Sequence, residues 1–324
     1  MMADVAQVSI VIPTHNRPQL LRRAVASVVA QTFRDWELLV VQNGGTRESE
    51  AVVEAFRAQG APIRYLYEPV ANAVRARNLG IERSAGEYIA FLDDDDEWLP
   101  EKLERQVEVL ERDPDIGLVA CRAWRVDQGG SVIDEVPSHA GEITYRTLVT
   151  QPSMITSLSS VLIRREVLER VGALNADFRI ADDYDLYLRV ARICCITMLK
   201  AVLYRYAWHG GNTSKGSEHL WREKVMVLRR QSSADAWGVS RRLLQRSIAQ
   251  YAVHFYSIGV TAMDERRFRA AARSFAMAVR LDPLVGVKVP WSRSTNAGYR
   301  AARPFVAAVY CGLRAFAMAE TAAK

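Results

Sequence analysis

The sequence predicts an α/β fold with a mainly parallel sheet flanked by helices, followed by an α-helical C-terminal region. Short β-branched runs such as Val8–Ile12 and Trp36–Val41 alternate with longer segments that carry apolar residues at helical spacing. This alternation is typical of parallel strands joined by helical crossovers. From about Glu218 onward the strand pattern stops, and segments rich in Ala, Arg and Leu predict several helices.

The expected elements follow one another at short intervals. Pro13 ends the first strand, and a polar turn leads into the first helix. Apolar spacing then predicts helices over 20–29, 48–59 and 73–84, and strands over 36–41 and 63–67. After a buried strand over 88–92, we expect a helix from Pro100, strands over 116–126, 159–163 and 196–206, and helices within 144–153, 166–171 and 183–191.

Charge and composition divide the chain near residue 215. With 324 residues, 49% hydrophobic and 25% charged, the protein has the composition of an ordinary soluble globular chain. Gly, Ser and Asn gather over 212–217 and indicate a linker between an α/β domain over 1–215 and a helical region over 216–324. Residues 218–324 carry a net charge of +11 and residues 1–217 one of −5. A basic appendage suggests an anionic partner, such as a membrane surface, an acidic polymer or a nucleic acid.

The cysteines and the N-terminus predict an intracellular protein. Cysteines occupy positions 121, 194, 195 and 311, and none forms a CxxC pair, so we expect reduced core residues rather than disulfides or zinc ligands. The N-terminus lacks the basic and apolar segments of a signal peptide. An uncharged apolar stretch of 18 residues is also missing, so the sequence predicts no transmembrane helix.

Four consecutive aspartates, Asp93–Asp96, follow the apolar strand Tyr88–Leu92 directly. In an open α/β sheet, the carboxyl edge of the strands is where ligands bind. Carboxylates there suit Mg²⁺ or Mn²⁺, and such an ion suits a diphosphate. The alternative is an acidic helix N-terminus favoured by the helix dipole, which accounts for Asp96 and Glu97 more easily than for all four acids.

Four blocks of sequence, in order, resemble family 2 glycosyltransferases of the GT-A fold. They read VSIVIPTHNRP, ARNLGIERSAGEYIAFLDDDDEWLPEKL, ADDYDLYLRVA and YRYAWHGGNTS, and the resemblance covers roughly residues 7–215. It implies that a sugar is moved from a nucleotide-diphosphate sugar to an acceptor, with inversion at the anomeric carbon.

The resemblance assigns roles to the acidic run and to a later histidine. The DxD motif of the family places Asp93 near the donor ribose and the metal, and Asp95 on the metal. Asp96 could share this work, whereas Asp94 falls at the x position and has no assigned role, although it belongs with the nucleotide-sugar contacts. His209 matches the closing loop, where a histidine can complete the shell of Mg²⁺ or Mn²⁺; a lone surface histidine is the alternative.

The catalytic base is expected in the ADDYD segment. An inverting displacement needs a base for the proton of the acceptor hydroxyl. The matching residue is Asp183, with Asp182 as the alternative. Both could instead serve only as caps of the helix that starts there.

Nucleotide recognition is expected at the ends of the first two strands. Pro13, Thr14 and Asn16 match the first turn of the family, and Arg77 matches its ARN segment, where it would face the base or a phosphate unless it is a solvated helix residue. The second turn departs from the family pattern, because Gln42 and Asn43 stand where an Asp commonly reads the base. An amide oxygen still accepts a hydrogen bond but lacks the strength of a carboxylate. UDP-sugar is therefore the default donor, with a guanine or other base as the alternative.

The acceptor side is assigned from three aromatic residues and one loop. Trp98, Trp124, Tyr184 and the loop 151–160 lie where an acceptor sugar could stack or form hydrogen bonds, although aromatic residues in such positions also form cores. We expect a saccharide or lipid-linked saccharide as acceptor and no nucleic-acid partner.

The helical tail contains one motif and one amphipathic segment. Residues 252–285 match a single tetratricopeptide unit, which cannot bury its own apolar face without neighbours. Residues 299–319 are apolar with interspersed arginines, as in an interfacial helix on an anionic membrane; packing on the repeat is the equal alternative.

These inferences describe an inverting, metal-dependent hexosyltransferase of cell-surface polysaccharide synthesis, in the cytoplasm and peripheral to the inner face of the membrane. Two other classes stay open. A sugar nucleotidyltransferase uses a similar sheet and carboxylates, but the segment THNRPQLLRR lacks the glycine of its phosphate loop. A non-catalytic scaffold with a degenerate transferase domain is suggested by the altered Gln42–Asn43 turn.

Overall fold

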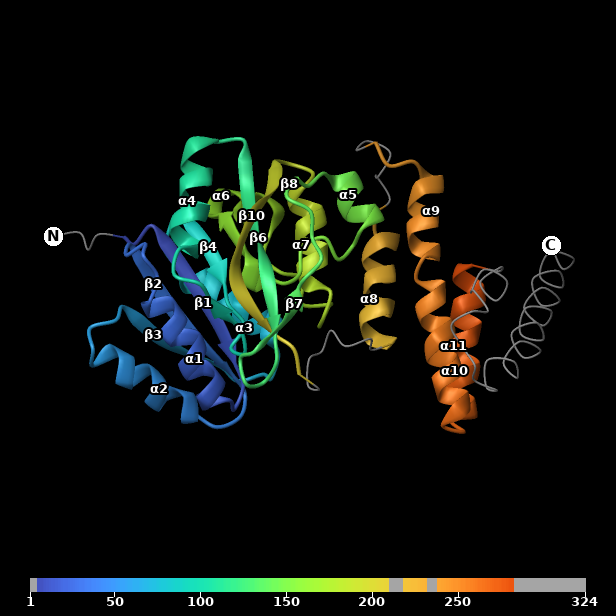
Figure 1. Cartoon of the computed structure of the whole chain (residues 1–324), viewed down its shortest axis with the longest axis horizontal. Helices are drawn as coiled ribbons and strands as arrows, with labels where there is room; N and C mark the ends of the chain where they lie inside the picture. Colours follow the sequence, from blue (N-terminus) through green and yellow to red (C-terminus); the bar gives the residue numbers. More distant parts are fainter. Residues whose placement is uncertain (1–4, 210–217, 232–237, 283–324) are drawn as a thin grey trace, which may run out of the picture. The chain divides into compact units, whose positions relative to one another are not determined.

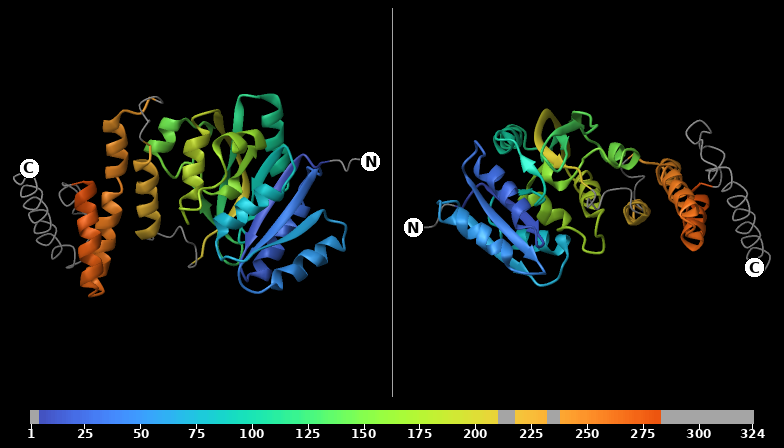
Figure 2. Two further views of the ribbon diagram at one scale, coloured as in Figure 1. Left: turned by 180° about the vertical axis from the view of Figure 1, so that it is seen from behind. Right: turned by 60° about the horizontal axis from the view of Figure 1, so that its bottom comes forward.

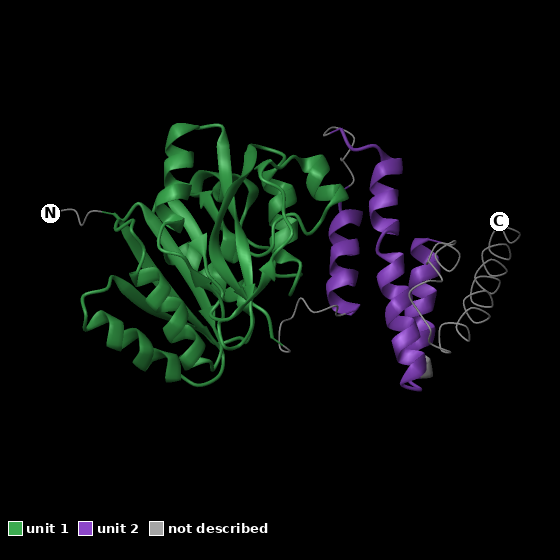
Figure 3. Ribbon diagram, viewed as in Figure 1, with its two compact units in different colours: residues 1–212 green, residues 213–324 purple. Residues whose placement is uncertain are grey.

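The computed structural model describes residues 5–209, 218–231 and 238–282 (Figure 1). The chain divides into two compact units, residues 1–212 and 213–324 (Figure 3). The first unit holds a sheet with helices on both faces. In the second unit, the described residues form helices.

The sheet of the first unit is mixed, with strand order β3-β2-β1-β4-β9-β6-β10-β5. The first four strands in this order run parallel, β9 is antiparallel to both of its neighbours, and β6 and β10 are again parallel. The bounds are β1 (Val8–Thr14), β2 (Trp36–Asn43), β3 (Ile63–Glu68), β4 (Tyr88–Phe91), β5 (Glu97–Trp98), β6 (Ile116–Val126), β7 (Val132–Glu135), β8 (Gly141–Glu142), β9 (Val161–Arg164) and β10 (Cys195–Ala207).

Helices cover both faces of this sheet (Figure 2). Alternate residues of β1, β2, β4 and β6 form one apolar cluster with α1, α2 and α4. On the other face α3 packs on β1 so closely that a Cβ at Gly80 would lie 2.3 Å from Cγ1 of Val11. The helices of the unit are α1 (Pro18–Val29), α2 (Glu48–Arg57), α3 (Ala73–Arg83), α4 (Lys102–Arg112), α5 (Tyr145–Thr150), α6 (Arg165–Val171) and α7 (Asp182–Val190).

The predicted α/β fold is confirmed, with local corrections. Pro13 does not end the first strand, because β1 continues to Thr14 beside β2. Pairing of β1 with β4 stops at Val11, so Pro13 lies where the strand no longer has two partners and its missing N–H is tolerated. The helix expected from Pro100 begins at Lys102. Strands β5, β7 and β8 have two to four residues, too few to produce a periodic pattern.

The cysteine prediction is correct only in part. Cys121 is buried, Cys194 is half-buried and Cys195 is exposed at the start of β10, and all three are free thiols. The expectation of a core residue is therefore wrong for Cys195, because its apolar neighbours in sequence mark a strand that is only partly covered. Cys311 lies outside the described residues.

The second unit contains α8 (Glu218–Arg229), α9 (Arg241–Ala249), α10 (Ala252–Asp264) and α11 (Phe268–Leu281). Helices α10 and α11 form a hairpin in which a Cβ at Gly259 would lie 2.7 Å from the Phe275 ring. Helix α8 packs on α10 through Trp221, whose ring stacks on His254 at 3.9 Å between centroids. None of the helices in the described ranges has the length and apolar character needed to cross a membrane. The segment 299–319 lies outside those ranges.

Candidate active site

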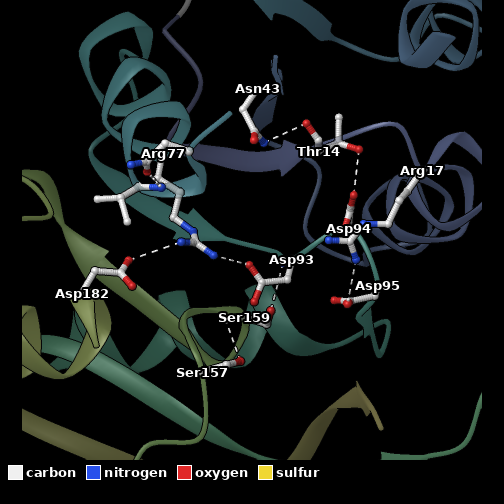
Figure 4. Close-up of polar contacts among 12 residues, drawn as sticks. Thr14, Arg17, Asn43, Arg77, Asp93, Asp94, Asp95, Ser157, Ser159 and Asp182 are labelled. Carbon is white, nitrogen blue, oxygen red and sulfur yellow. Dashed lines mark hydrogen bonds and ion pairs between the residues drawn. The ribbon is translucent and has the colours of Figure 1, made fainter. Parts of the chain in front are cut away.

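The four aspartates lie on a tight turn one residue after β4. Figure 4 shows the first three of them, Asp93, Asp94 and Asp95. The N–H of Leu92 still donates to the carbonyl of Val11, at 3.1 Å, and so continues the pairing with β1. The N–H of Asp96 then donates back to the carbonyl of Asp93, also at 3.1 Å. The chain turns so sharply here that the four carboxylates reach different partners.

Asp93 and Asp95 are the two accessible acids of the turn, with side chains 29% and 17% exposed. An oxygen of Asp93 accepts from Arg77 of α3 at 2.6 Å. Oδ2 of Asp95 lies 3.1 Å from Nη1 of Arg17 and 3.1 Å from Nε2 of His209. Each accessible carboxylate therefore contacts a basic side chain from another part of the first unit.

Asp94 and Asp96 are buried and have different partners. Oδ2 of Asp94 accepts from the hydroxyl of Thr14 at 2.8 Å, and burial raises the pKa of Asp94 to about 6 although Arg17 opposes the shift. Oδ1 of Asp96 accepts from the N–H of Ala207 at 2.9 Å. Burial, together with the charges of Asp95 and Asp93, raises the pKa of Asp96 well above its ordinary value. Asp94 thus has a structural partner, Thr14, that the sequence did not suggest. Asp96 is bonded to the end of β10.

Arg77 joins the acidic turn to the ADDYD segment (Figure 4). Its guanidinium binds Asp93 at 2.6 Å and Asp182 at 3.3 Å, and its side chain is only 11% exposed. Burial disfavours the charge of Arg77, but the two carboxylates outweigh it and raise its pKa. The alternative that Arg77 is a solvated helix residue is therefore wrong, while its contact with a base or phosphate stays a prediction. The arginine holds together two motifs that lie far apart in the sequence.

The two acids that begin α7 differ in burial. Asp182 is 4% exposed and carries the ion pair with Arg77, whereas Asp183 is half-buried. An oxygen of Asp183 accepts from the N–H of Tyr184 at 2.6 Å. Asp185, which we expected to support the helix start, is paired with Arg189 at 2.9 Å. Of the three acids, Asp183 is the most accessible to a ligand.

The turns after β1 and β2 hold each other in place. Asn16, with a φ of 52°, accepts from the N–H of Thr46 at 2.9 Å. The amide of Asn43 donates to the carbonyl of Thr14 at 2.8 Å, and that of Gln42 donates to the carbonyl of Gly44 at 2.7 Å. Oε1 of Gln42 is buried without a hydrogen-bond partner among the described atoms. The predicted nucleotide residues therefore gather at one edge of the sheet.

Two of the three predicted acceptor residues are wrong. Trp98 is 3% exposed and its indole N–H donates to the carbonyl of Ser159 at 2.9 Å. Tyr184 is 2% exposed and its hydroxyl donates to the carbonyl of Leu148 at 3.0 Å. Both rings belong to the core and cannot stack on an acceptor. Trp124 in β6 is half-buried, and its contact with an acceptor stays a prediction.

The sequence reasoning missed Arg17 and Ser159. The hydroxyl of Ser159 accepts from the N–H of Asp93 at 3.0 Å and so fixes the start of the acidic turn. No local pattern around Ser159 points to this contact. Arg17 could have been found, because a basic residue in a polar turn at a sheet edge is a natural partner for acids at the same edge.

The comparison with known families agrees with this geometry. The model of the family described as "Glycosyl transferase family 2" matches residues 9–172, about half of the chain. The chain belongs to glycosyltransferase family 2. An uncharacterized glycosyltransferase of Rickettsia conorii is 27% identical to it over 212 residues, which make up 64% of this chain and 35% of that relative. The chain thus spans about a third of the length of this relative.

Solved structures show that this glycosyltransferase has the predicted GT-A fold. The crystal structure of residues 1–349 of S. aureus TarS in complex with UDP-GlcNAc superposes with a TM-score of 0.65 at 15% identity, over 94% of this chain and 87% of that one. The mannosyltransferase PcManGT of Pyrobaculum calidifontis, in complex with GDP-Man and Mn²⁺, gives a TM-score of 0.57 at 17% identity, with the same coverage of 94% and 87%.

A divalent ion would find two side-chain ligands here and would complete its shell with other oxygens. The described residues contain no group of three or more His, Cys, Asp or Glu side chains that could hold a metal. Asp95 and His209 nevertheless offer an oxygen and a nitrogen 3.1 Å apart, while Asp93 is held by Arg77. Mg²⁺ commonly binds one or two carboxylates and completes its shell with phosphate oxygens and water. The residues therefore fit an ion that completes its shell with water, or with the oxygens of a diphosphate when one is bound.

Proposed function

We propose that the protein is an inverting, metal-dependent glycosyltransferase that moves a sugar from a nucleotide-diphosphate sugar to a saccharide or lipid-linked saccharide. The product would serve in cell-surface polysaccharide synthesis. The observation that carries the proposal is the position of Arg77, bound to Asp93 at 2.6 Å and to Asp182 at 3.3 Å. An inverting displacement needs a donor site and a base on opposite sides of one reacting carbon. A single buried guanidinium between the two acidic motifs supports such an arrangement.

Asp183 is our candidate for the base. It is half-buried and accessible, whereas its rival Asp182 is 4% exposed and engaged with Arg77. A base must reach the acceptor hydroxyl within hydrogen-bond distance. Asp182 acts instead as the residue that fixes the start of α7, so that Asp183 faces the acceptor. Transfer of the hydroxyl proton to the carboxylate of Asp183 then accompanies attack on the anomeric carbon.

The donor side is assigned to the acidic turn and the first two strand ends. Asp93 orients the donor sugar and ribose, and Asp95 and His209, with Asp93, would hold Mg²⁺ or Mn²⁺. When bound, the ion would supply positive charge to the departing diphosphate. Asp94 contributes by fixing the turn through Thr14 rather than by reaching the donor.

We assign the contacts with the nucleobase of the donor to Pro13, Asn16, Gln42 and Asn43. TarS was solved with UDP-GlcNAc and PcManGT with GDP-Man, so structures of this fold accommodate both bases. The side-chain NH2 of Gln42 donates to the carbonyl of Gly44 at 2.7 Å and to Oδ1 of Asn16 at 3.5 Å, so its carbonyl oxygen is the atom left to accept an N–H of the base. We keep UDP-sugar as the default and GDP-sugar as the alternative.

The C-terminal region is proposed as an anchoring element beside a catalytic domain over 1–215. The α10–α11 hairpin, with Gly259 against Phe275, supports a single tetratricopeptide-like unit. The segment 299–319 is proposed to hold the enzyme at the inner face of the membrane. Loss of liposome binding after removal of residues 285–324 would support this part, and unchanged binding would contradict it.

A donor screen tests the enzyme against the scaffold alternative, which the Gln42–Asn43 turn favours. The full chain is incubated with UDP-, GDP- and dTDP-sugars and Mn²⁺, and the released nucleoside diphosphate is measured. We expect slow hydrolysis of one donor class, because water can replace an absent acceptor, and we expect EDTA to abolish it. Absence of both hydrolysis and nucleoside diphosphate binding would contradict the proposal.

A further inference from the structure

Arg17 lies between the two carboxylates at the centre of the acidic turn. Its Nη1 is 3.3 Å from Oδ1 of Asp94 and 3.1 Å from Oδ2 of Asp95. The residue precedes Pro18, the first residue of α1, and so comes from the turn after β1 rather than from the acidic turn itself. Figure 4 shows its guanidinium beside Asp94 and Asp95.

The same oxygen of Asp95 that contacts Arg17 also faces His209. Oδ2 of Asp95 lies 3.1 Å from each of the two side chains. A divalent ion held by Asp95 and His209 would therefore need the oxygen that Arg17 occupies. Two cations at one carboxylate oxygen repel each other, and a guanidinium cannot lose its charge to relieve this.

The side chain of Arg17 can move away from Asp95 more easily than the two aspartates can move, because it is more exposed to solvent. Its side chain is 45% exposed, whereas those of Asp94 and Asp95 are 5% and 17% exposed. A guanidinium released from Asp95 would find its next anion in a diphosphate bound at the same ion, because planar N–H groups match phosphate oxygens well.

We propose that Arg17 is a counter-cation that neutralises the acidic turn in the empty enzyme and binds the diphosphate of the donor once a divalent ion occupies Asp95 and His209. This inference rests on the proposed function and adds a residue to it. Arg17 competes with the ion before the nucleotide arrives and cooperates with it afterwards. Removal of Arg17 must therefore change the two affinities in opposite directions.

The test measures binding by calorimetry on the full chain, with Mn²⁺ alone and then with UDP or GDP at saturating Mn²⁺. For Arg17→Ala we expect Mn²⁺ alone to bind about three- to tenfold more tightly, because a competitor is lost. The nucleotide should bind about tenfold more weakly, because a charge-assisted phosphate contact is lost. Arg17→Lys should restore Mn²⁺ binding to the wild-type level and nucleotide binding in part.

Arg22→Ala is the matched control, since it removes an exposed arginine from α1, the helix that follows Arg17, and should leave both affinities unchanged. Weaker Mn²⁺ binding by Arg17→Ala, or unchanged nucleotide binding, would overturn the inference while leaving the proposed function intact. Failure of the wild-type chain to bind either nucleotide in the presence of Mn²⁺ would instead overturn both.

Discussion

Neighbouring carboxylates in the acidic turn have opposite surroundings. Asp93 and Asp95 are 29% and 17% exposed and face basic side chains, while Asp94 and Asp96 are almost fully buried and bind a hydroxyl and a backbone N–H. Arg17 also lies 3.3 Å from Asp94, so the two pairs differ in burial rather than in charge alone. Four identical residues in a row therefore divide into two pairs. The accessible pair can exchange its cations for a ligand, and the buried pair holds the turn and the end of β10 in place.

The ADDYD segment repeats this division in a second place. Asp182 is 4% exposed and bound by Arg77, and Asp183 next to it is half-buried. Burial thus distinguishes acids that the fold holds in place from acids that a ligand can reach, which residue type alone does not.

The largest effect is expected for Asp183→Asn. An amide cannot accept the proton of the acceptor hydroxyl, so transfer should fall by about 10²- to 10⁴-fold. Binding of the donor, measured by calorimetry, should stay within about twofold, because the substitution keeps size and polarity. Asp182→Asn is the companion variant. Robust transfer by Asp183→Asn together with inactive Asp182→Asn would place the base at Asp182 and break the comparison in this segment.

Asp95→Ala should cost about a hundredfold in Mn²⁺-dependent nucleotide binding, as expected when a ligand or its direct support is lost. Its thermal stability should change little, because the side chain is partly exposed. Asp35→Ala, which removes an exposed acid from the same unit, is the control and should bind nucleotide normally. Equal nucleotide affinity for Asp95→Ala and the control would remove Asp95 from the site.

Asp94→Asn should stabilise the protein above pH 6. Burial raises the pKa of Asp94 to about 6 from 3.8, so the folded protein holds this proton more tightly than the unfolded chain. Stability therefore decreases as the pH rises from 3.8 to about 6, and the cost of the charge is fully present above that range. Removing the charge should add up to about 3 kcal/mol at pH 8. Urea denaturation at pH 8 and pH 4.5 measures the difference in the free energy of unfolding between the variant and the wild type. A stabilisation that is larger at pH 4.5 than at pH 8 would contradict the prediction.

Lys102→Met extends the comparison to a buried cation and should give the smallest effect, about 1–2 kcal/mol of added stability at pH 7. The ammonium of Lys102 donates to Oε1 of Gln106 at 2.6 Å and lies 4.1 Å from the ring centre of Trp98, and burial lowers its pKa to about 8 from 10.5. The cost of its charge is fully present below pH 8. It declines as the pH rises toward 10.5, because the folded protein loses the proton first.

The measurement for Lys102→Met is chemical denaturation at pH 7 and pH 10. The advantage of the variant over the wild type should shrink between these two values. A variant that is less stable than the wild type at pH 7 would mean that the contacts with Gln106 and Trp98 outweigh the burial of the charge.

The sequence was sufficient to predict the location of the acidic turn. An apolar run that ends in acids and is followed by a helix is a local pattern, and so is the repeated strand and helix alternation before it. The surroundings of each aspartate within the turn could not be predicted in this way, because they depend on residues far away in the sequence. Asp94 is buried by Thr14 and Asp96 by Ala207, residues that lie 80 and 111 positions away. Only the paired strands bring these partners together.

The prediction of acceptor contacts for Trp98 and Tyr184 failed for a similar reason. Trp98 lies two residues after Asp96, which suggested a position next to the substrate. Its ring is instead buried because Ser159, 61 positions away, supplies a carbonyl for the indole N–H. Tyr184 finds its carbonyl at Leu148 in the same way. A polar tip allows Trp and Tyr to enter a core once a distant partner exists, and sequence alone does not reveal that partner.

The bond between Asp96 and the N–H of Ala207 has a mechanical consequence. Ala207 is the last residue of β10, and His209 follows two positions later with its own contact to Asp95. The chain leaves the first unit just after these residues, at the junction of the two units. Residues 207–209 are thus bonded to the acidic turn at two points, so a displacement of this segment would move Asp95 and Asp96 with it. The end of the first unit and the candidate site therefore share His209, which contacts Asp95.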